Sequence, residues 1–147
     1  MRTCYYTGIT MACPLFLPGA PLDGFAPEAT SLGELYDGRC SADTGVVVPP
    51  GTLRRCCNRG YARNVCAPAA TSGADAFRFL VKADDGDTVT VAWSTERNHL
   101  PLAVGSTAVT ATPASSAEPL ELQARACAAA YRRLAGKKAI ALCHIAI

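Results

Sequence analysis

The fold is decided by residues 77–93, which read FRFLVKADDGDTVTVAW. Apolar and polar side chains alternate on both sides of the acidic centre, a pattern typical of half-buried strands. The centre, at 84–87, contains Asp-Gly, the preferred pair of tight hairpin turns. We therefore predict an antiparallel hairpin with one apolar face. Residues 104–112 predict a third, weaker strand.

A helix is predicted after the small-residue linker at 113–119. The residues that recur at helical spacing are Leu120, Ala124, Cys127, Tyr131 and Leu134. Ser116 or Glu118 is expected to cap the start, and Gly136 to end the helix. The tail at 137–147 is then a final strand or a frayed end. A small antiparallel sheet packed by a C-terminal helix gives the α+β class.

Residues 1–70 have a different character. Seven prolines and many glycines interrupt them, so long helices and central strands are not expected. Such a segment has little hydrogen-bonded framework and needs an external constraint. We predict a loop-rich, cysteine-containing lobe at 1–70 and a hairpin-plus-helix unit at 71–147, joined in one compact domain.

Cysteines are concentrated in that lobe. Of the eight in the chain, six lie in the first 66 residues: Cys4, Cys13, Cys40, Cys56, Cys57 and Cys66. No secretory signal and no apolar run of about 20 residues is visible, so we expect a cytoplasmic protein without a membrane span. In that compartment clustered cysteines bind metals more often than they form disulfides. A thiol-redox or disulfide-bonded exported protein is the alternative.

The spacing contains no Cys-x-x-Cys knuckle, so each ligand of a metal site would come from a different loop. Proline follows Cys13, a Gly-Arg turn precedes Cys40, and a turn at 58–61 can aim the thiolate of Cys57. Adjacent cysteines seldom bind the same metal centre together, which makes Cys56 a spare. The predicted metal ligands are Cys13, Cys40, Cys57 and Cys66, with Cys4 and Cys56 as substitutes.

The first 66 residues also resemble a group of small, cysteine-rich bacterial proteins. The shared pattern is Cys13-Pro14, then LGELY at 32–36 with Gly38 and Cys40, then CNxGYA at 57–62 and Cys66. The resemblance implies the same four cysteines as ligands and assigns no activity.

Charge supports a metal site independently. Between Asp43 and Asp75 there is no acidic residue, whereas four arginines accompany the cysteines: Arg54, Arg55, Arg59 and Arg63. Four thiolates on Zn²⁺ or on a [4Fe–4S]²⁺ core leave a net negative charge, which nearby cations stabilise. We therefore predict that these arginines support the bound group. A solvated basic loop and a nucleic-acid surface are the other interpretations.

Long, irregular separations favour an iron–sulfur cluster, with zinc as the alternative. Four thiolates would occupy every iron, which favours electron transfer with a protein redox partner, or sensing, over catalysis. A zinc-stabilised interaction module is the second hypothesis. No catalytic triad or phosphate-binding glycine loop is present, and a net charge of +2 does not by itself indicate nucleic acid. His99 is expected in a solvated turn, and Cys127 as a small core residue.

Overall fold

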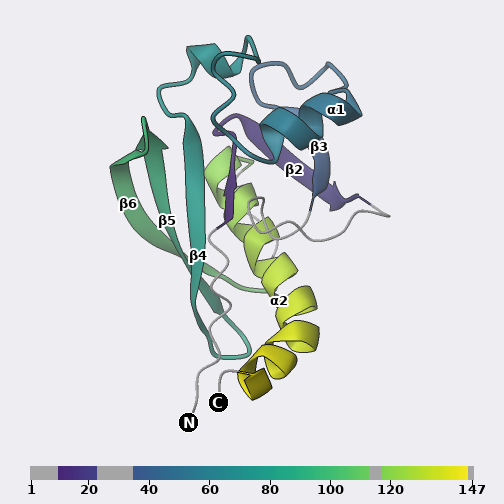
Figure 1. Cartoon of the computed structure of the whole chain (residues 1–147), viewed down its shortest axis with the longest axis vertical. Coiled ribbons are helices and arrows are strands. Elements are labelled where there is room, and N and C mark those ends of the chain that lie inside the picture. The colour runs from purple at the N-terminus through teal and green to yellow at the C-terminus, as the bar shows by residue number, and fades with distance from the viewer. Residues whose placement is uncertain (1–9, 23–34, 113–116, 146–147) are drawn as a thin grey trace.

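The computed structural model describes residues 10–22, 35–112 and 117–145, and its side chains as far as Arg133. Figure 1 shows the elements, which in chain order are β1 (Thr10–Ala12), β2 (Phe16–Pro21), β3 (Tyr36–Cys40), α1 (Pro50–Thr52), the π-helical turn η1 (Leu53–Cys57), the 3₁₀ turn η2 (Ala69–Thr71), β4 (Ala76–Asp84), β5 (Val89–Arg97), β6 (Leu100–Val109) and α2 (Pro119–Ile145).

The predicted hairpin is formed by β4 and β5, in antiparallel register from Ala76↔Glu96 to Asp84↔Val89. Its turn is built by acidic side chains rather than by a two-residue Asp-Gly pair. The Asp85 carboxylate accepts hydrogen bonds from the amides of Asp87 (3.0 Å) and Thr88 (2.7 Å). Such side-chain bonds to the following backbone are the reason aspartate favours turns.

The third strand, β6, starts four residues earlier than predicted, at Leu100. Asn98 and His99 both adopt positive φ angles (52° and 65°), so the chain reverses directly after β5. The sheet is completed on its other side by β1, giving the order β1-β4-β5-β6. A second sheet of two antiparallel strands joins β2 to β3.

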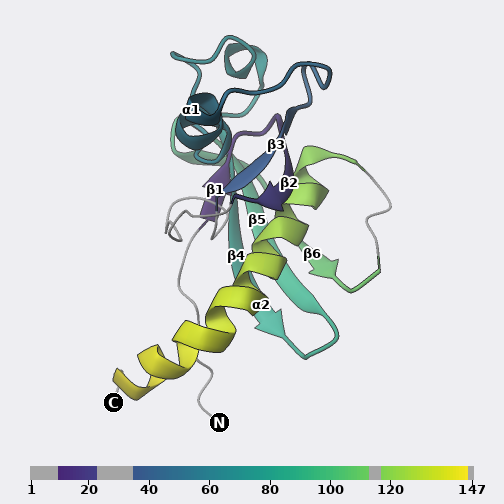
Figure 2. The same cartoon turned by 90° about the vertical axis from the view of Figure 1, so that its right-hand side faces the viewer.

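Helix α2 lies across one face of the larger sheet, as Figure 2 shows, so the predicted α+β architecture is confirmed. Phe79 and Val91 on the sheet and Ala124 and Cys127 on the helix are all buried. Cys127 is the small core residue that the sequence predicts, and its Sγ lies 3.3 Å from the hydroxyl of Thr10.

The prediction that α2 ends at Gly136 is wrong, because the helix continues to Ile145. An interior glycine costs a helix only about 1 kcal/mol, and good helix formers follow it at 137–142. The residues expected to be a strand or a frayed end are therefore helical up to Ile145. Ser116, one of the two expected caps, lies outside the described residues, and Glu118 directly precedes the first helical residue.

The loop-rich lobe packs on this framework through a shared core. Phe16, Tyr36 and Leu53 from the lobe belong to the same cluster of buried side chains as Phe79 and Val91 from the sheet. The Tyr36 hydroxyl donates to the backbone carbonyl of Ala126 in α2 (2.9 Å). Within the described part of the chain, no helix is both long and apolar enough to cross a membrane.

Candidate metal centre

Five cysteines line one cavity in the lobe. They come from four separate segments: the turn after β1, the end of β3, the turn η1 and the loop before η2. The set consists of the four predicted ligands, Cys13, Cys40, Cys57 and Cys66, together with Cys56. Cys4 lies outside the described residues. In Figure 1 this lobe occupies the end of the molecule opposite the β4–β5 turn.

The backbone holds the Cys13 and Cys57 segments against each other. The amide of Cys13 donates to the carbonyl of Cys57 (3.0 Å), and the carbonyl of Cys13 accepts from the amide of Phe16 (3.0 Å). Helix α2 adds a clamp through the fully buried Gln123. Its Nε2 donates to the backbone carbonyls of Cys13 (2.8 Å) and Phe16 (2.9 Å). The backbone of Cys13 is therefore held both by α2 and by the Cys57 segment.

The turn that carries Cys57 is anchored by Asn58, which is completely buried. Its side-chain amide donates to the carbonyls of Tyr36 (3.0 Å) and Leu53 (2.8 Å), and its side-chain oxygen accepts from the amide of Tyr36 (3.0 Å). These bonds join η1 to β3. Single π-helical turns are rare and occur often at functional sites.

Glycine at position 60 is required by both conformation and space. Gly60 has φ +74°, and a Cβ there would lie 2.8 Å from the Cβ of Ala76. Because only glycine adopts this geometry without strain, the chain can turn tightly from η1 back to the sheet. This is the turn that the sequence predicts directly after Cys57.

Cys40 and Cys66 are held by ordinary loop hydrogen bonds. Cys40 pairs with Phe16 at the end of β3, and the amide of the following residue, Ser41, donates to the carbonyl of Leu15 (2.7 Å). The amide of Cys66 donates to the carbonyl of Ala62 (2.8 Å). Both thiols are half-buried, whereas Cys13, Cys56 and Cys57 are buried.

Cys56 lines the same cavity as the adjacent Cys57, although the sequence predicts that only one of the two would take part in the site. Successive side chains point to opposite faces in a strand, but in a helical turn they are only about 100° apart. The adjacent pair lies in such a turn, η1. Both thiols can therefore border one space.

Burial favours the protonated form of Cys13 and Cys57 in the metal-free protein. Burial, with smaller contributions from the neighbouring thiols Cys40 and Cys66, raises the pKa of Cys13 to about 11, although a hydrogen bond from the backbone of Leu15 opposes the shift. Burial, followed by the proximity of Cys13 and Cys66, raises the pKa of Cys57 to about 12.

Burial, followed by the proximity of Cys66, also raises the pKa of Cys56, and the charge of Arg55 only partly offsets this. None of the six described cysteines forms a disulfide.

The cavity has a volume of about 250 Å³. That is several times the roughly 30 Å³ that one water molecule occupies. A structural zinc ion, with sulfur ligands at about 2.3 Å, would draw its four ligands into direct contact. Among the described residues no group of three or more His, Cys, Asp or Glu side chains is arranged to hold a metal ion.

Apart from Asp43 and Thr52, the remaining wall of the cavity is apolar, and a run of valines forms its outer side. Val46, Val47 and Val48 line the cavity, and Val47 is 88 % exposed to solvent. In the sequence, three consecutive valines between Gly45 and Pro49 are the signal of this wall, for which no role was predicted.

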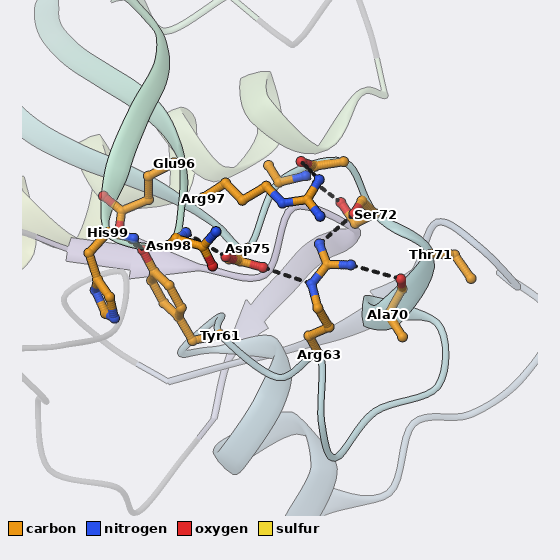
Figure 3. Close-up of polar contacts among 12 residues, drawn as sticks. Tyr61, Arg63, Ala70, Thr71, Ser72, Asp75, Glu96, Arg97, Asn98 and His99 are labelled. Atoms are coloured by element: carbon orange, nitrogen blue, oxygen red, sulfur yellow. Dashed lines mark hydrogen bonds and ion pairs between the residues drawn. The ribbon is translucent and has the colours of Figure 1, made fainter.

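None of the four predicted arginines lines the cavity. Arg54, Arg55 and Arg59 are exposed on and beside η1, and the Nε of Arg55 donates to the carbonyl of Gly51 (3.2 Å). Arg63 points elsewhere, as Figure 3 shows. Its guanidinium donates to Asp75 (3.0 Å) and to two carbonyls of the η2 segment.

Arg63 belongs to a polar network that joins the lobe to the sheet (Figure 3). The Tyr61 hydroxyl donates to Glu96, which also pairs with Arg78 (2.8 Å), and the ring of Tyr61 stacks on His99 with centroids 4.4 Å apart. The amide of Asn98 donates to Asp75 (2.8 Å), and this bond and the Arg63 guanidinium hold the pKa of Asp75 below its usual value. His99 is thus in an exposed turn, as predicted, although its ring has an aromatic partner.

Comparisons of the chain with family models, with curated proteins and with solved structures gave no match.

Proposed function

We propose that the protein binds an iron–sulfur cluster of the [4Fe–4S] type through Cys13, Cys40, Cys57 and Cys66. The observation that carries the proposal is that four cysteines spread over more than fifty residues of sequence line a single cavity. A bound cluster would supply one-electron redox chemistry, with a potential set by charge, burial and hydrogen bonds to sulfur. Electron transfer or redox sensing is the activity that such a site supports.

The surrounding residues are suited to that role. Gln123 and Asn58 fix the loops that present Cys13 and Cys57, so little rearrangement is needed when a group is bound. Apolar side chains make up most of the rest of the cavity wall, and the backbone of Leu15 offers a hydrogen bond to the sulfur of Cys13. Such outer contacts orient the ligands and tune the metal centre.

A protein redox partner would approach at the valine wall. Val46 and Val47 are exposed there, and the exposed Arg54 and Arg55 lie on the adjoining turn. A small apolar contact with charged surroundings is characteristic of weak electron-transfer encounters. We place the protein in the cytoplasm, where reducing conditions keep the thiols available to a metal.

The thiol-redox alternative is less well supported. The reactive form of cysteine is the thiolate, and catalytic cysteines have lowered pKa values. Here burial raises the pKa of Cys13, Cys56 and Cys57. These three thiols are therefore poor nucleophiles without a metal, but a bound cation would favour their deprotonated form.

The test is anaerobic purification and reconstitution, followed by absorbance spectroscopy and chemical determination of iron, acid-labile sulfide and zinc. We expect a brown protein that absorbs near about 400 nm and contains about four irons and four sulfides per chain. A colourless protein with one zinc per chain would show the zinc-stabilised module instead. A protein that contains neither iron nor zinc and shows no free thiols after denaturation would overturn both metal hypotheses and indicate disulfides.

A further inference from the structure

A polar pocket lies where the lobe meets the turn between β5 and β6. Its volume is about 360 Å³, at the lower end of the range for small-molecule sites. The residues that line it are Tyr61, Arg63, Asn64, Asp75, Asn98 and His99. It shares no lining residue with the cysteine cavity, so whatever it binds is independent of the proposed metal centre.

The β5–β6 turn places a histidine at this pocket against its own backbone preference. Arg97 pairs with Leu100, so the turn consists of Asn98 and His99, both with positive φ angles. These are the features of a type I′ turn, in which asparagine is favoured at the first position and glycine at the second. His99 therefore occupies the place of a glycine, and its side chain has to account for the conformational cost.

The side chain of His99 forms an aromatic platform with Tyr61. The two rings stack with centroids 4.4 Å apart and planes inclined by 9°, and the amide of His99 donates to the Tyr61 hydroxyl (3.1 Å). Tyr61 also has a positive φ angle, of 54°. Glycines apart, the three described residues in this conformation all line the one pocket. Backbone conformations that cost energy cluster at ligand-binding sites.

The charges of the pocket cancel. Its only carboxylate, Asp75, is 6 % exposed and pairs with its only guanidinium, that of Arg63 (3.0 Å), as Figure 3 shows. Asp75 also accepts from the amide of Asn98 (2.8 Å). With histidine neutral, the lining has no net charge and attracts neither anions nor cations. The pocket is therefore suited to a neutral ligand.

The groups left for a ligand both donate and accept hydrogen bonds. The side chains of Asn64, Asn98 and His99 make no hydrogen bond to any other residue in the described part of the chain. Their donors and acceptors are fixed, whereas a hydroxyl both donates and accepts and rotates to suit its partner. A ring with several hydroxyls satisfies all three. Its C–H face can also pack on the aromatic platform, because the face of an aromatic ring is negative.

We propose that this pocket binds a neutral sugar, one ring at a time, on the platform formed by Tyr61 and His99. The carboxamides of Asn64 and Asn98 bind its hydroxyls. A nucleobase is the competing ring ligand. Its donors and acceptors are as fixed as those of the pocket, so every contact would have to match, whereas hydroxyls adapt.

Saturation-transfer NMR of the full chain with glucose, galactose, mannose and N-acetylglucosamine tests the proposal, with adenosine and uridine as competing probes. We expect at least one sugar to bind with a Kd of about 1–10 mM, and the nucleosides to bind at least about tenfold more weakly. His99→Gly removes half of the platform but supplies the residue that the turn prefers, so the fold is retained and sugar binding should weaken about tenfold. Lys82→Ala, at an exposed residue of β4 outside the pocket, is the control and should bind unchanged.

Absence of saturation transfer to all four sugars would overturn the proposal, as would tighter binding of either nucleoside. Equal sugar affinity in His99→Gly and the unmodified protein would also contradict it, because the sugar would then bind elsewhere. Asn64→Ala changes an exposed side chain outside the turn and gives a second test that does not depend on the folding of the turn variant. It should weaken sugar binding about threefold or more, and an unchanged Kd would exclude its carboxamide from the site.

Discussion

Two buried carboxamides connect the cysteine loops to the framework. Asn58 joins η1 to β3 through two hydrogen bonds with Tyr36 and makes a third within η1, and Gln123 joins α2 to the Cys13 turn through two. A carboxamide suits both positions because it can donate to carbonyls, and Asn58 also accepts from an amide. Neither residue stands out in the sequence, because asparagine and glutamine are common in exposed loops and helices.

Asn58→Ala should destabilise the protein by about 2–4 kcal/mol. The substitution leaves the amide and carbonyl of Tyr36 and the carbonyl of Leu53 buried without the bonds that Asn58 provides. Urea unfolding of the metal-free, reduced protein measures the change. Asn64→Ala, at an exposed asparagine, is the control and should change stability by less than about 0.5 kcal/mol. Equal effects of the two substitutions would show that the Asn58 bonds contribute little.

Cys57→Ser should abolish retention of the cluster, because serine provides no thiolate at a position that lines the cavity together with the other predicted ligands. Cys127→Ala should retain the full iron and sulfide content, since this thiol lies in the core between α2 and the sheet. Iron, sulfide and absorbance near about 400 nm are compared after identical reconstitution. Unchanged iron in Cys57→Ser would transfer the ligand role to Cys56, the other thiol of the pair.

At the scale of elements, the sequence was informative where a periodic pattern and a turn signal agreed. The alternation on either side of residues 84–87 predicts β4 and β5, and the helical spacing from Leu120 predicts the start of α2. It was less informative where the structure depends on distant contacts. The π-helical form of η1 is accompanied by hydrogen bonds from Asn58 to the preceding β3, which no local pattern specifies. The position of β6 also depended on the left-handed turn at Asn98 and His99.

Gly136→Ala should stabilise the protein by about 0.5–1 kcal/mol, because position 136 lies inside α2 and alanine is the better helix former. Gly86→Ala is the matched contrast. Gly86 has φ +96° in the β4–β5 turn, so the same substitution there should destabilise by about 1 kcal/mol. Thermal and urea unfolding measure the change in the free energy of unfolding for both variants. A loss of stability in Gly136→Ala would indicate that the helix does end there, with the glycine as its C-terminal cap.

At the scale of the whole molecule, four cysteine-bearing segments converge although no local motif places them together. Turns, a proline and the exclusion of one adjacent thiol predict four of the five cysteines that line the cavity, and their role as ligands stays a prediction. Their convergence on one cavity is a property of the fold: β2 and β3 bring Cys13 and Cys40 together, and the bond from Cys13 to Cys57 brings in η1. The membership of Cys56 depends on helical rather than extended backbone at that pair, which the sequence does not specify.

Buried thiols make the stability of the metal-free protein fall in alkaline solution. In the unfolded chain the thiols ionise near their ordinary pKa of 9.0, whereas in the folded protein burial raises the pKa of Cys13 to about 11 and that of Cys57 to about 12. Above pH 9 the folded state therefore binds more protons than the unfolded state, and the free energy of unfolding decreases as pH rises. This stabilisation is fully present below pH 9 and is lost between pH 9 and about 12.

Urea unfolding of the reduced, metal-free protein at several pH values from about 8 to about 11 measures this dependence. The double variant Cys13→Ala/Cys57→Ala should show a shallower decrease over the same range. It should not remove the decrease entirely, because burial also raises the pKa of Cys127 to about 11 and that of Tyr61 to about 12. Identical slopes in the two proteins would mean that the cavity thiols are solvated, and that the lobe does not enclose them without a metal.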